Sequence, residues 1–130
     1  MEFTVRTTIT SDQMATKTVT KSFTAEGFDE IEVVLAPAAA DIEVDVCPGA
    51  VEGQIKIVQV GEKTGVYPAG LSYKVHEDTA GPVAFTEPHT YLGYQDQISA
   101  GAFDKLFFSN AGTGSVTVTV FVARNVVPAP

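Results

Sequence analysis

The chain has no tryptophan, one cysteine and only four leucines among its 130 residues. A single cysteine cannot form an intramolecular disulfide, so the sequence does not require an oxidising compartment. Cys47 lies between Val46 and Pro48, without a basic neighbour to stabilise a thiolate, and we expect an unreactive, partly buried thiol. A chain of this length can fold without a disulfide or a structural metal.

Positive charge is also scarce, because 16 acidic residues outnumber 8 lysines and arginines and leave a formal net charge of −8. Nucleic-acid binding depends on neutralising phosphates, so we expect no nucleic-acid partner. An anionic membrane surface is disfavoured for the same reason. No run reaches the roughly 18 apolar residues of a membrane span, and residues 1–20 contain no apolar stretch of signal-peptide length. We therefore expect no membrane partner, and synthesis in the cytoplasm without a cleaved leader.

The abundant residues are β-branched, with 18 valines and 15 threonines. Their stiff side chains suit a pleated surface. Apolar and polar residues alternate with the period of half-buried strands over residues 3–9, 16–24, 30–35, 41–46, 54–60, 71–76, 83–86, 104–109 and 115–123. This pattern, with turn signals between the segments, predicts an all-β protein. We expect one antiparallel β-sandwich or jelly-roll-like domain over residues 1–130, with about eight or nine short strands.

The last two predicted strands carry finer expectations. Residues 104–109 and 115–123 flank Gly112 and Gly114, which predicts that the two strands form a β-hairpin. Residues 99–108 place apolar side chains near helical spacing, which favours a single helical turn at the start of this region.

The ends of the chain allow more than one interpretation. Residues 1–10 are either an ordinary edge strand or an arm that adds a strand to a neighbouring subunit or partner. Residues 126–130 contain two prolines, and we expect a frayed tail.

An acidic cluster is the sharpest candidate for a cation site. Asp41, Glu43 and Asp45 fall on one face of a predicted strand, about 7 Å apart. A straight strand holds them too far apart for one Ca²⁺ ion, whose oxygen ligands lie within about 2.6 Å. We expect a solvated acidic face, its charge partly offset by Lys56 on the following strand, and no metal site. Cation binding is the alternative.

Catalytic motifs are missing from the sequence. His76 and His89 are thirteen residues apart and match no metal-ligand spacing, so we expect two surface histidines. The sequence has no GxSxG elbow, no GxGxxG and no phosphate-binding loop. Paired carboxylates for glycoside hydrolysis meet in space rather than in sequence, and no positive feature favours them. We predict a protein that is not an enzyme, without catalytic residues and without a cofactor.

Aromatic residues gather in the irregular half of the chain, at Tyr67, Phe85, Tyr91 and Tyr94. They could cover the open end of a sandwich core, anchor a protein partner, or stack on sugars. The sugar interpretation makes the chain a carbohydrate-binding or adhesive module. The residues that we expect at a partner interface combine the tyrosines with the first strand: Phe3, Val5, Ile9, Tyr67, Tyr91 and Tyr94.

Three stretches carry a resemblance to a known class of proteins: PAAADIEVDVCPG (37–49), LSYKVHEDTAGPVAFTEPHTYLG (71–93) and DKLFFSNAGTGSVTVTVFVARN (104–125). Over roughly residues 30–125 the chain resembles small all-β virion proteins of tailed bacteriophages, and is most similar to the capsid decoration, or cement, class. The likeness is one of Val/Thr/Ala-rich texture and a hairpin-like end rather than of a diagnostic motif. Head fibres and tail components share this texture.

The resemblance implies a location, a partner and a function. Proteins of this class sit on the outer surface of the head, at junctions between subunits of the major capsid protein. They are often homotrimers, and they reinforce the head against internal pressure. They have no catalytic residues, so no residue role is carried over. The resemblance therefore implies a structural virion protein that is a homo-oligomer and binds the major capsid protein.

Overall fold

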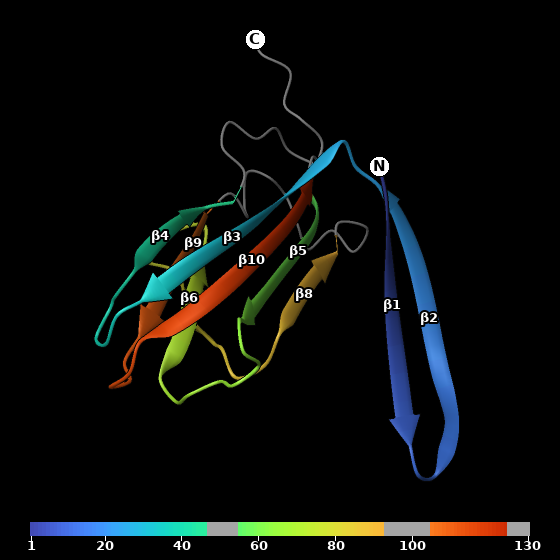
Figure 1. Ribbon diagram of the computed structural model, residues 1–130, viewed down its shortest axis with the longest axis horizontal. Helices are drawn as coiled ribbons and strands as arrows, with labels where there is room; N and C mark the ends of the chain where they lie inside the picture. The colour runs from blue at the N-terminus through green and yellow to red at the C-terminus, as the bar shows by residue number, and fades with distance from the viewer. Residues whose placement is uncertain (47–54, 93–104, 125–130) are drawn as a thin grey trace.

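The computed structural model describes residues 1–46, 55–92 and 105–124, which form ten strands and no helix (Figure 1). Every strand pair is antiparallel, so the all-β prediction is confirmed. The strands are β1 (Glu2–Ser11), β2 (Met14–Thr24), β3 (Gly27–Leu35), β4 (Ile42–Asp45), β5 (Ile55–Glu62), β6 (Leu71–Val75), β7 (Val83–Ala84), β8 (His89–Leu92), β9 (Lys105–Asn110) and β10 (Val116–Arg124).

Eight of these strands form a sandwich of two four-stranded sheets. The first sheet has the order β3-β10-β5-β8 and the second has the order β4-β9-β6-β7. Strands that follow each other in sequence mostly lie in opposite sheets, which is the arrangement of a double-sheet jelly roll. The predicted sandwich or jelly-roll architecture is therefore confirmed, with its strands drawn from the chain after the first hairpin.

The core lies between the two sheets and follows the alternation of the sequence. On β10, Val118, Val120 and Val122 are fully buried, while Thr119 and Phe121 lie on the outer face of the first sheet. The second sheet contributes Leu106, Phe108 and Tyr73, which are also fully buried. Each buried valine or leucine stabilises the fold by about 1.5–3 kcal/mol relative to an exposed one, so the inward face of each strand fixes its register.

The predicted hairpin between the last two strands is wrong, because β9 and β10 lie in different sheets. The glycine-rich turn crosses the end of the sandwich, and the side chain of Asn110 holds it there. Fully buried Asn110 donates through Nδ2 to the carbonyl oxygens of Leu35 (3.2 Å) and Gly114 (2.9 Å), and its Oδ1 accepts from the N–H of Gly112 (3.0 Å). Asn110 thus ties β9, the turn and the end of β3 together.

The predicted helical turn over residues 99–108 is replaced by a strand wherever the chain is described. Residues 105–108 belong to β9, and Leu106 and Phe108 are buried while Phe107 between them is only half-buried. The period is therefore two, because the second sheet buries one face of this segment. The remainder of the predicted turn, residues 99–104, lies outside the described residues, as do Cys47 and the tail at 126–130.

The first two strands form a separate two-stranded sheet, which we call the arm (residues 2–24). Figure 1 shows the arm running beside the sandwich, with its tip beyond the end of the body. Only its base packs on the first sheet: the ring of Phe3 lies 6.0 Å from that of Phe28 and 5.9 Å from that of Phe121. The N–H of Ala25 also donates to the carbonyl oxygen of Met1 at 3.0 Å. Residues 6–13 and 15–22 are all exposed.

Candidate functional site

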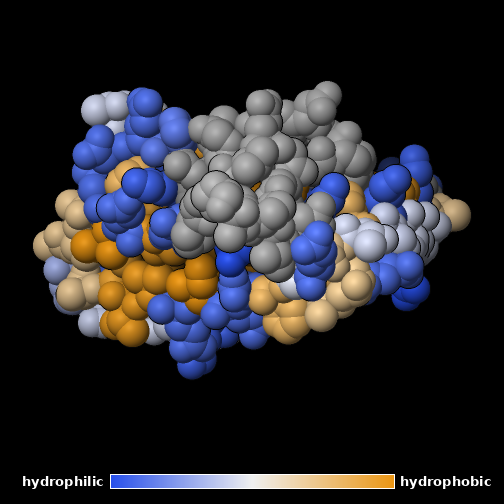
Figure 2. Space-filling view, turned by 90° about the horizontal axis from the view of Figure 1, so that it is seen from above, coloured by the Kyte–Doolittle hydropathy of each residue, from blue (hydrophilic) through white to orange (hydrophobic). Residues whose placement is uncertain are grey.

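The arm presents two faces of different chemistry. Cross-strand partners in an antiparallel pair point to the same side, and the register pairs Val5 with Lys21, Thr7 with Val19 and Ile9 with Lys17. We call this set the lysine face: Val5, Thr7, Ile9, Lys17, Val19 and Lys21. The opposite side is rich in hydroxyl groups, and the Oγ1 atoms of Thr8 and Thr18 lie 3.5 Å apart. Figure 2 shows the arm at the right-hand end of the molecule, mostly in the pale and blue colours of hydroxyl-bearing and charged residues.

Both outer edges of the arm are available for strand pairing. Among the described residues, β1 and β2 pair only with each other, so each leaves one row of backbone N–H and C=O groups without a strand partner. Such edges can add a strand to a neighbouring sheet. The first strand therefore belongs to an arm and to neither sandwich sheet; whether it adds to a partner stays a prediction.

The outer face of the first sheet is hollowed over its length. At the arm base, a groove of about 690 Å³ lies between the arm and this sheet. A second hollow of about 600 Å³ continues from it through Gln59 and Phe121, which line both. The absence of a side chain at Gly61 deepens this second hollow. We call it the outer trough, formed by Glu30, Glu32, Gln59, Gly61, Thr119 and Phe121.

The predicted interface residues of the first strand occupy two environments. Phe3 and Val5 are half-buried and pack at the arm base against the cluster that contains Phe23 and Ile57. Ile9 lies far along the arm and is 53% exposed. Contact of these residues with a partner stays a prediction, and Ile9 is the one that the fold itself leaves uncovered.

Two of the predicted interface tyrosines, Tyr67 and Tyr91, pack against the sandwich core. Tyr67 is half-buried, its ring lies 5.2 Å from that of fully buried Phe85, and its hydroxyl accepts from the N–H of Glu62 at 3.0 Å. Tyr91 is half-buried on β8 and packs against the same core. Tyr94 lies outside the described residues. The structure thus places two of these rings where they cover the core, and their role at an interface stays a prediction.

A hydrogen-bonded group around Tyr73 was not predicted from the sequence. The buried hydroxyl of Tyr73 bonds to Nδ1 of His89 at 2.5 Å and to the hydroxyl of Tyr91. Burial, and then the hydrogen bond to Tyr91, raise the pKa of Tyr73 far above its ordinary value. The alternation of Leu71 and Tyr73 on the core face was the signal for a buried tyrosine, which needs a hydrogen-bond partner.

The prediction of two surface histidines holds for one of them. The side chain of His76 is 41% exposed, and its Nε2 lies 3.8 Å from the carboxylate of Glu77. His89 is half-buried instead, because it begins β8 and packs against the rings of Tyr73 and Phe85. His89 lies in a strand because β8 pairs with β5, on the opposite edge from β10.

The acidic cluster is a solvated face, as predicted, with Asp41, Glu43 and Asp45 all exposed. Asp41 precedes β4 with a positive φ of 51°, so it leaves the line of the other two. Lys74 lies 3.0 Å from Asp41, and the described residues contain no cluster of three or more metal-ligating side chains.

The prediction that Lys56 offsets the charge of the acidic cluster is wrong. Lys105 lies 2.9 Å from Glu43, whereas Lys56 was predicted. The reason is the sheet order: β4 pairs with β9, which carries Lys105, and the strand that carries Lys56 belongs to the other sheet.

No protein-family model matches the chain, and no curated protein matches it. Within the described ranges no helix is long and apolar enough to cross a membrane. The fold presents two surfaces that could contact a partner, the arm and the outer trough.

Proposed function

We propose that the chain is a structural virion protein of a tailed bacteriophage, which decorates the outer surface of the head and binds the major capsid protein. The observation that carries this proposal is the arm. Its strands reach out over about 30 Å, at roughly 3.3 Å per residue, and they pack on their own body only at the base. An exposed hairpin with unpaired edges can add to a sheet of a neighbouring subunit.

The jelly roll is consistent with this function without determining it. Double-sheet jelly rolls occur in viral capsid and lectin domains, and one fold hosts many functions. The sequence resemblance to decoration proteins covers roughly residues 30–125, which is the sandwich. The arm precedes that region, so the two observations are independent of each other.

The charge distribution suits a protein that is added to an already assembled surface. Residues 25–130 contain fourteen acids and five bases, so free copies of the body repel each other and remain dispersed. On a lattice, many modest contacts act together and raise the effective affinity without one tight site. An oligomer would strengthen this effect because each copy adds a further contact.

Mass spectrometry of purified phage particles tests the proposal. We expect the chain at a fixed ratio to the major capsid protein, and we expect particles that lack it to lose their DNA at lower temperature. Particles should regain heat resistance when purified protein is added back, and an unrelated acidic protein of similar size serves as the control. Particles without the chain, or a chain bound to tails alone, would contradict the proposal.

The carbohydrate-binding alternative gains no specific observation from the described residues. Tyr91 directs its hydroxyl to Tyr73 and packs part of its ring on the core, so it offers little free face to a sugar ring. Binding to a glycan array that Tyr91→Ala abolishes would revive this alternative.

A further inference from the structure

Charge is segregated between the arm and the body. The arm contains three bases, Arg6, Lys17 and Lys21, and two acids, Glu2 and Asp12, neither of which belongs to the lysine face. The body carries almost all of the negative charge of the chain. An arm that presents bases and a body that presents acids are complementary surfaces, and complementary charge favours association in one orientation.

Three acids of the body line the outer trough, Glu30, Glu32 and Glu62, beside one base, Lys63. Glu30 and Glu32 lie on the trough side of β3, because their register partners Phe121 and Thr119 point away from the core. Glu32 forms an exposed ion pair with Lys63, at 3.2 Å and with both side chains 55% exposed. The trough is therefore an acidic-rimmed hollow with hydroxyl and apolar groups at its floor.

The same sheet face already accepts an arm. At the arm base, Phe3 packs edge-on against Phe28 and Phe121 of the first sheet. The lysine face continues from this contact with Val5, Thr7 and Val19, and these three residues line the groove beside the sheet. Alternating apolar and threonine side chains thus already match this sheet face over the first part of the arm.

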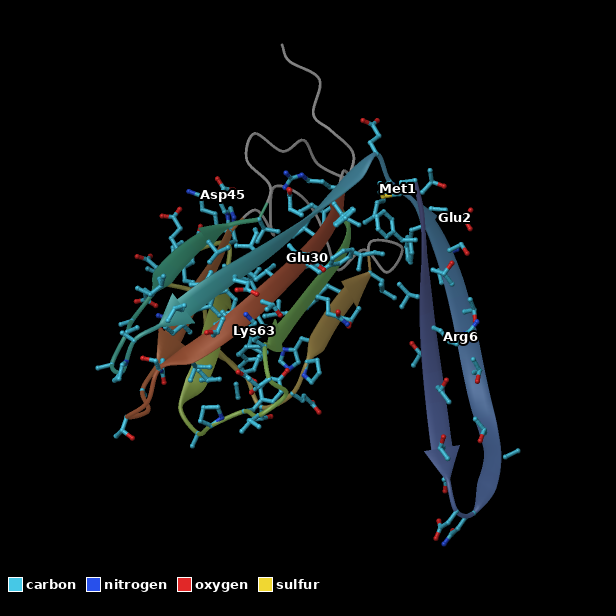
Figure 3. The ribbon with its side chains drawn as sticks, in the orientation of Figure 1. Met1, Glu2, Arg6, Glu30, Asp45 and Lys63 are labelled. Atoms are coloured by element: carbon cyan, nitrogen blue, oxygen red, sulfur yellow. The ribbon has the colours of Figure 1, made fainter. Side chains whose placement is uncertain are left out.

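The arm of a chain does not cover its own outer trough. Figure 3 shows Glu30 and Lys63 on the sandwich and Arg6 on the arm to one side of it, with the arm continuing away toward its tip. At the outer end of the lysine face, Ile9 is 53% exposed and lies outside the groove that Val5, Thr7 and Val19 line.

We propose that the arm of one copy, beyond the packed residues of its base, docks in the outer trough of a second copy. The lysine face lies against the floor around Gly61 and Thr119, and Lys17 and Lys21 approach the acidic rim formed by Glu30 and Glu32. The arm and the trough are different surfaces, so the contact is head-to-tail. The contact concerns this chain alone and does not rest on the proposed function.

Sedimentation velocity of the purified full-length chain tests this contact. We expect a concentration-dependent oligomer that weakens as salt rises, because exposed charges are screened. Two variants, K17E/K21E and E30K/E32K, should each weaken self-association by about tenfold or more, since each replaces attraction by repulsion.

Mixing the two variants provides the sharpest measurement. Each variant alone has an arm and a trough of like charge, whereas the mixture offers an acidic arm to a basic trough and a basic arm to an acidic trough. We expect association to return only in the mixture. An arm that folded back onto its own trough could not produce this result, because each chain would still combine an arm and a trough of like charge.

Matched controls separate the contact from general effects of charge and folding. K17R/K21R keeps the charge of the arm and should retain association. D45K/E77K changes the net charge as much as E30K/E32K does, but alters residues on β4 and just after β6, in the second half of the sandwich, and should associate like the unmodified chain. Circular dichroism confirms that each variant is folded.

Three results would overturn the proposal: an unmodified chain that stays monomeric at all concentrations, association that both charge reversals leave unchanged, or variants that remain monomeric when mixed. Because no capsid is present, these results leave the proposed function to be judged by the particle experiment alone.

Discussion

The arm and the sandwich body have similar alternating sequences, but only the strands of the body bury one of their faces in a core. β2 and β10 are both long strands in which β-branched residues alternate. On β10 the inward positions are valines, and Val118, Val120 and Val122 are fully buried. On β2 the corresponding positions are Lys17, Val19 and Lys21, and all three are exposed.

The difference in burial between β2 and β10 shows that strand formation and core formation depend on different features of the sequence. Alternation with a period of two specifies an extended strand, whereas the residue type on the repeated face decides whether a core forms on it. Eight of the 15 threonines lie in the arm, so neither of its faces is apolar enough to form a sandwich of its own. An isolated two-stranded hairpin is marginally stable, so the arm depends on the packing of its base on the first sheet.

Truncation of a large side chain in each region gives the largest contrast. We expect Phe108→Ala in the core to lower the free energy of unfolding by about 3–5 kcal/mol, because it leaves a cavity among fully buried groups. Ile9→Ala on the arm should change it by less than about 0.5 kcal/mol. Chemical denaturation followed by circular dichroism measures both, at concentrations where the chain is monomeric. Equal losses would mean that the arm is part of the cooperative core.

Removal of the buried Asn110 side chain should cause the next largest loss of stability. The turn that Asn110 holds has no equivalent in the arm. Asn110→Ala leaves the carbonyl oxygens of Leu35 and Gly114 and the N–H of Gly112 without this partner. Each unsatisfied buried group costs about 1–3 kcal/mol, and partial access of water reduces the total to about 2–3 kcal/mol. The same denaturation experiment measures this loss. Thr8→Ala, which removes an exposed hydroxyl contact in the arm, is the matched control and should have no measurable effect.

Much of the fold follows from local pattern, and the errors arise where partners are distant in sequence. The alternation around Val116–Val122 predicts β10, and similar alternation predicts most of the other strands. Which strands pair depends on which sheet each one joins, and no local signal carries that. The hairpin prediction and the assignment of Lys56 both failed for this reason.

The sequence does contain a signal for one feature that was missed, the buried Asn110. Leu106, Phe108 and Asn110 fall on the same face of β9, so an asparagine at the third position is a polar residue aimed at a core. Glycines at 112 and 114 directly after it indicate a turn that a side chain could hold. The partners of Tyr73 could not be predicted, because His89 and Tyr91 reach it only after β8 has joined the opposite sheet.

Removal of the Tyr73 hydroxyl should have an intermediate effect, and one that depends on pH. Tyr73→Phe leaves His89 and Tyr91 without their shared hydrogen-bond partner. His89 and Tyr91 are only half-buried, so water can replace part of this bonding, and we expect the free energy of unfolding to fall by about 1–2 kcal/mol at neutral pH. The folded-state pKa of Tyr73 is raised, so the folded protein keeps this phenol neutral while the unfolded chain ionises it near pH 10.

The stability that comes from this shift is fully present below about pH 10 and is lost as the pH rises further. Chemical denaturation at a series of alkaline pH values should therefore show a steeper loss for the unmodified chain than for Tyr73→Phe. Parallel slopes would show that Tyr73 ionises freely in the folded protein. The arm contains no tyrosine, so this alkaline effect is specific to the body.

We expect the smallest effect from Glu62, which holds the turn after β5, and we compare it with Ser11 in the turn of the arm. Glu62 Oε2 accepts from the hydroxyl of Thr64 (2.6 Å) and from the N–H groups of Thr64 (2.7 Å) and Val66 (2.9 Å). The Thr64 hydroxyl first, and then the backbone N–H groups, lower the pKa of Glu62, although partial burial opposes them. In the arm, Ser11 Oγ accepts one bond, from the N–H of Gln13 at 3.1 Å.

Glu62→Gln keeps an acceptor oxygen and removes its charge, so we expect a loss of about 0.5 kcal/mol or less at neutral pH. A lowered folded-state pKa contributes stability above the unfolded pKa, near 4.3, and that contribution is lost as the pH falls through the folded value. The difference between Glu62→Gln and the unmodified chain should therefore shrink in denaturation curves measured below about pH 4. Ser11→Ala should be silent at every pH, because the arm tip can open without unfolding the body. A gap for Glu62→Gln that stayed constant with pH would show that the carboxylate charge does not hold this turn.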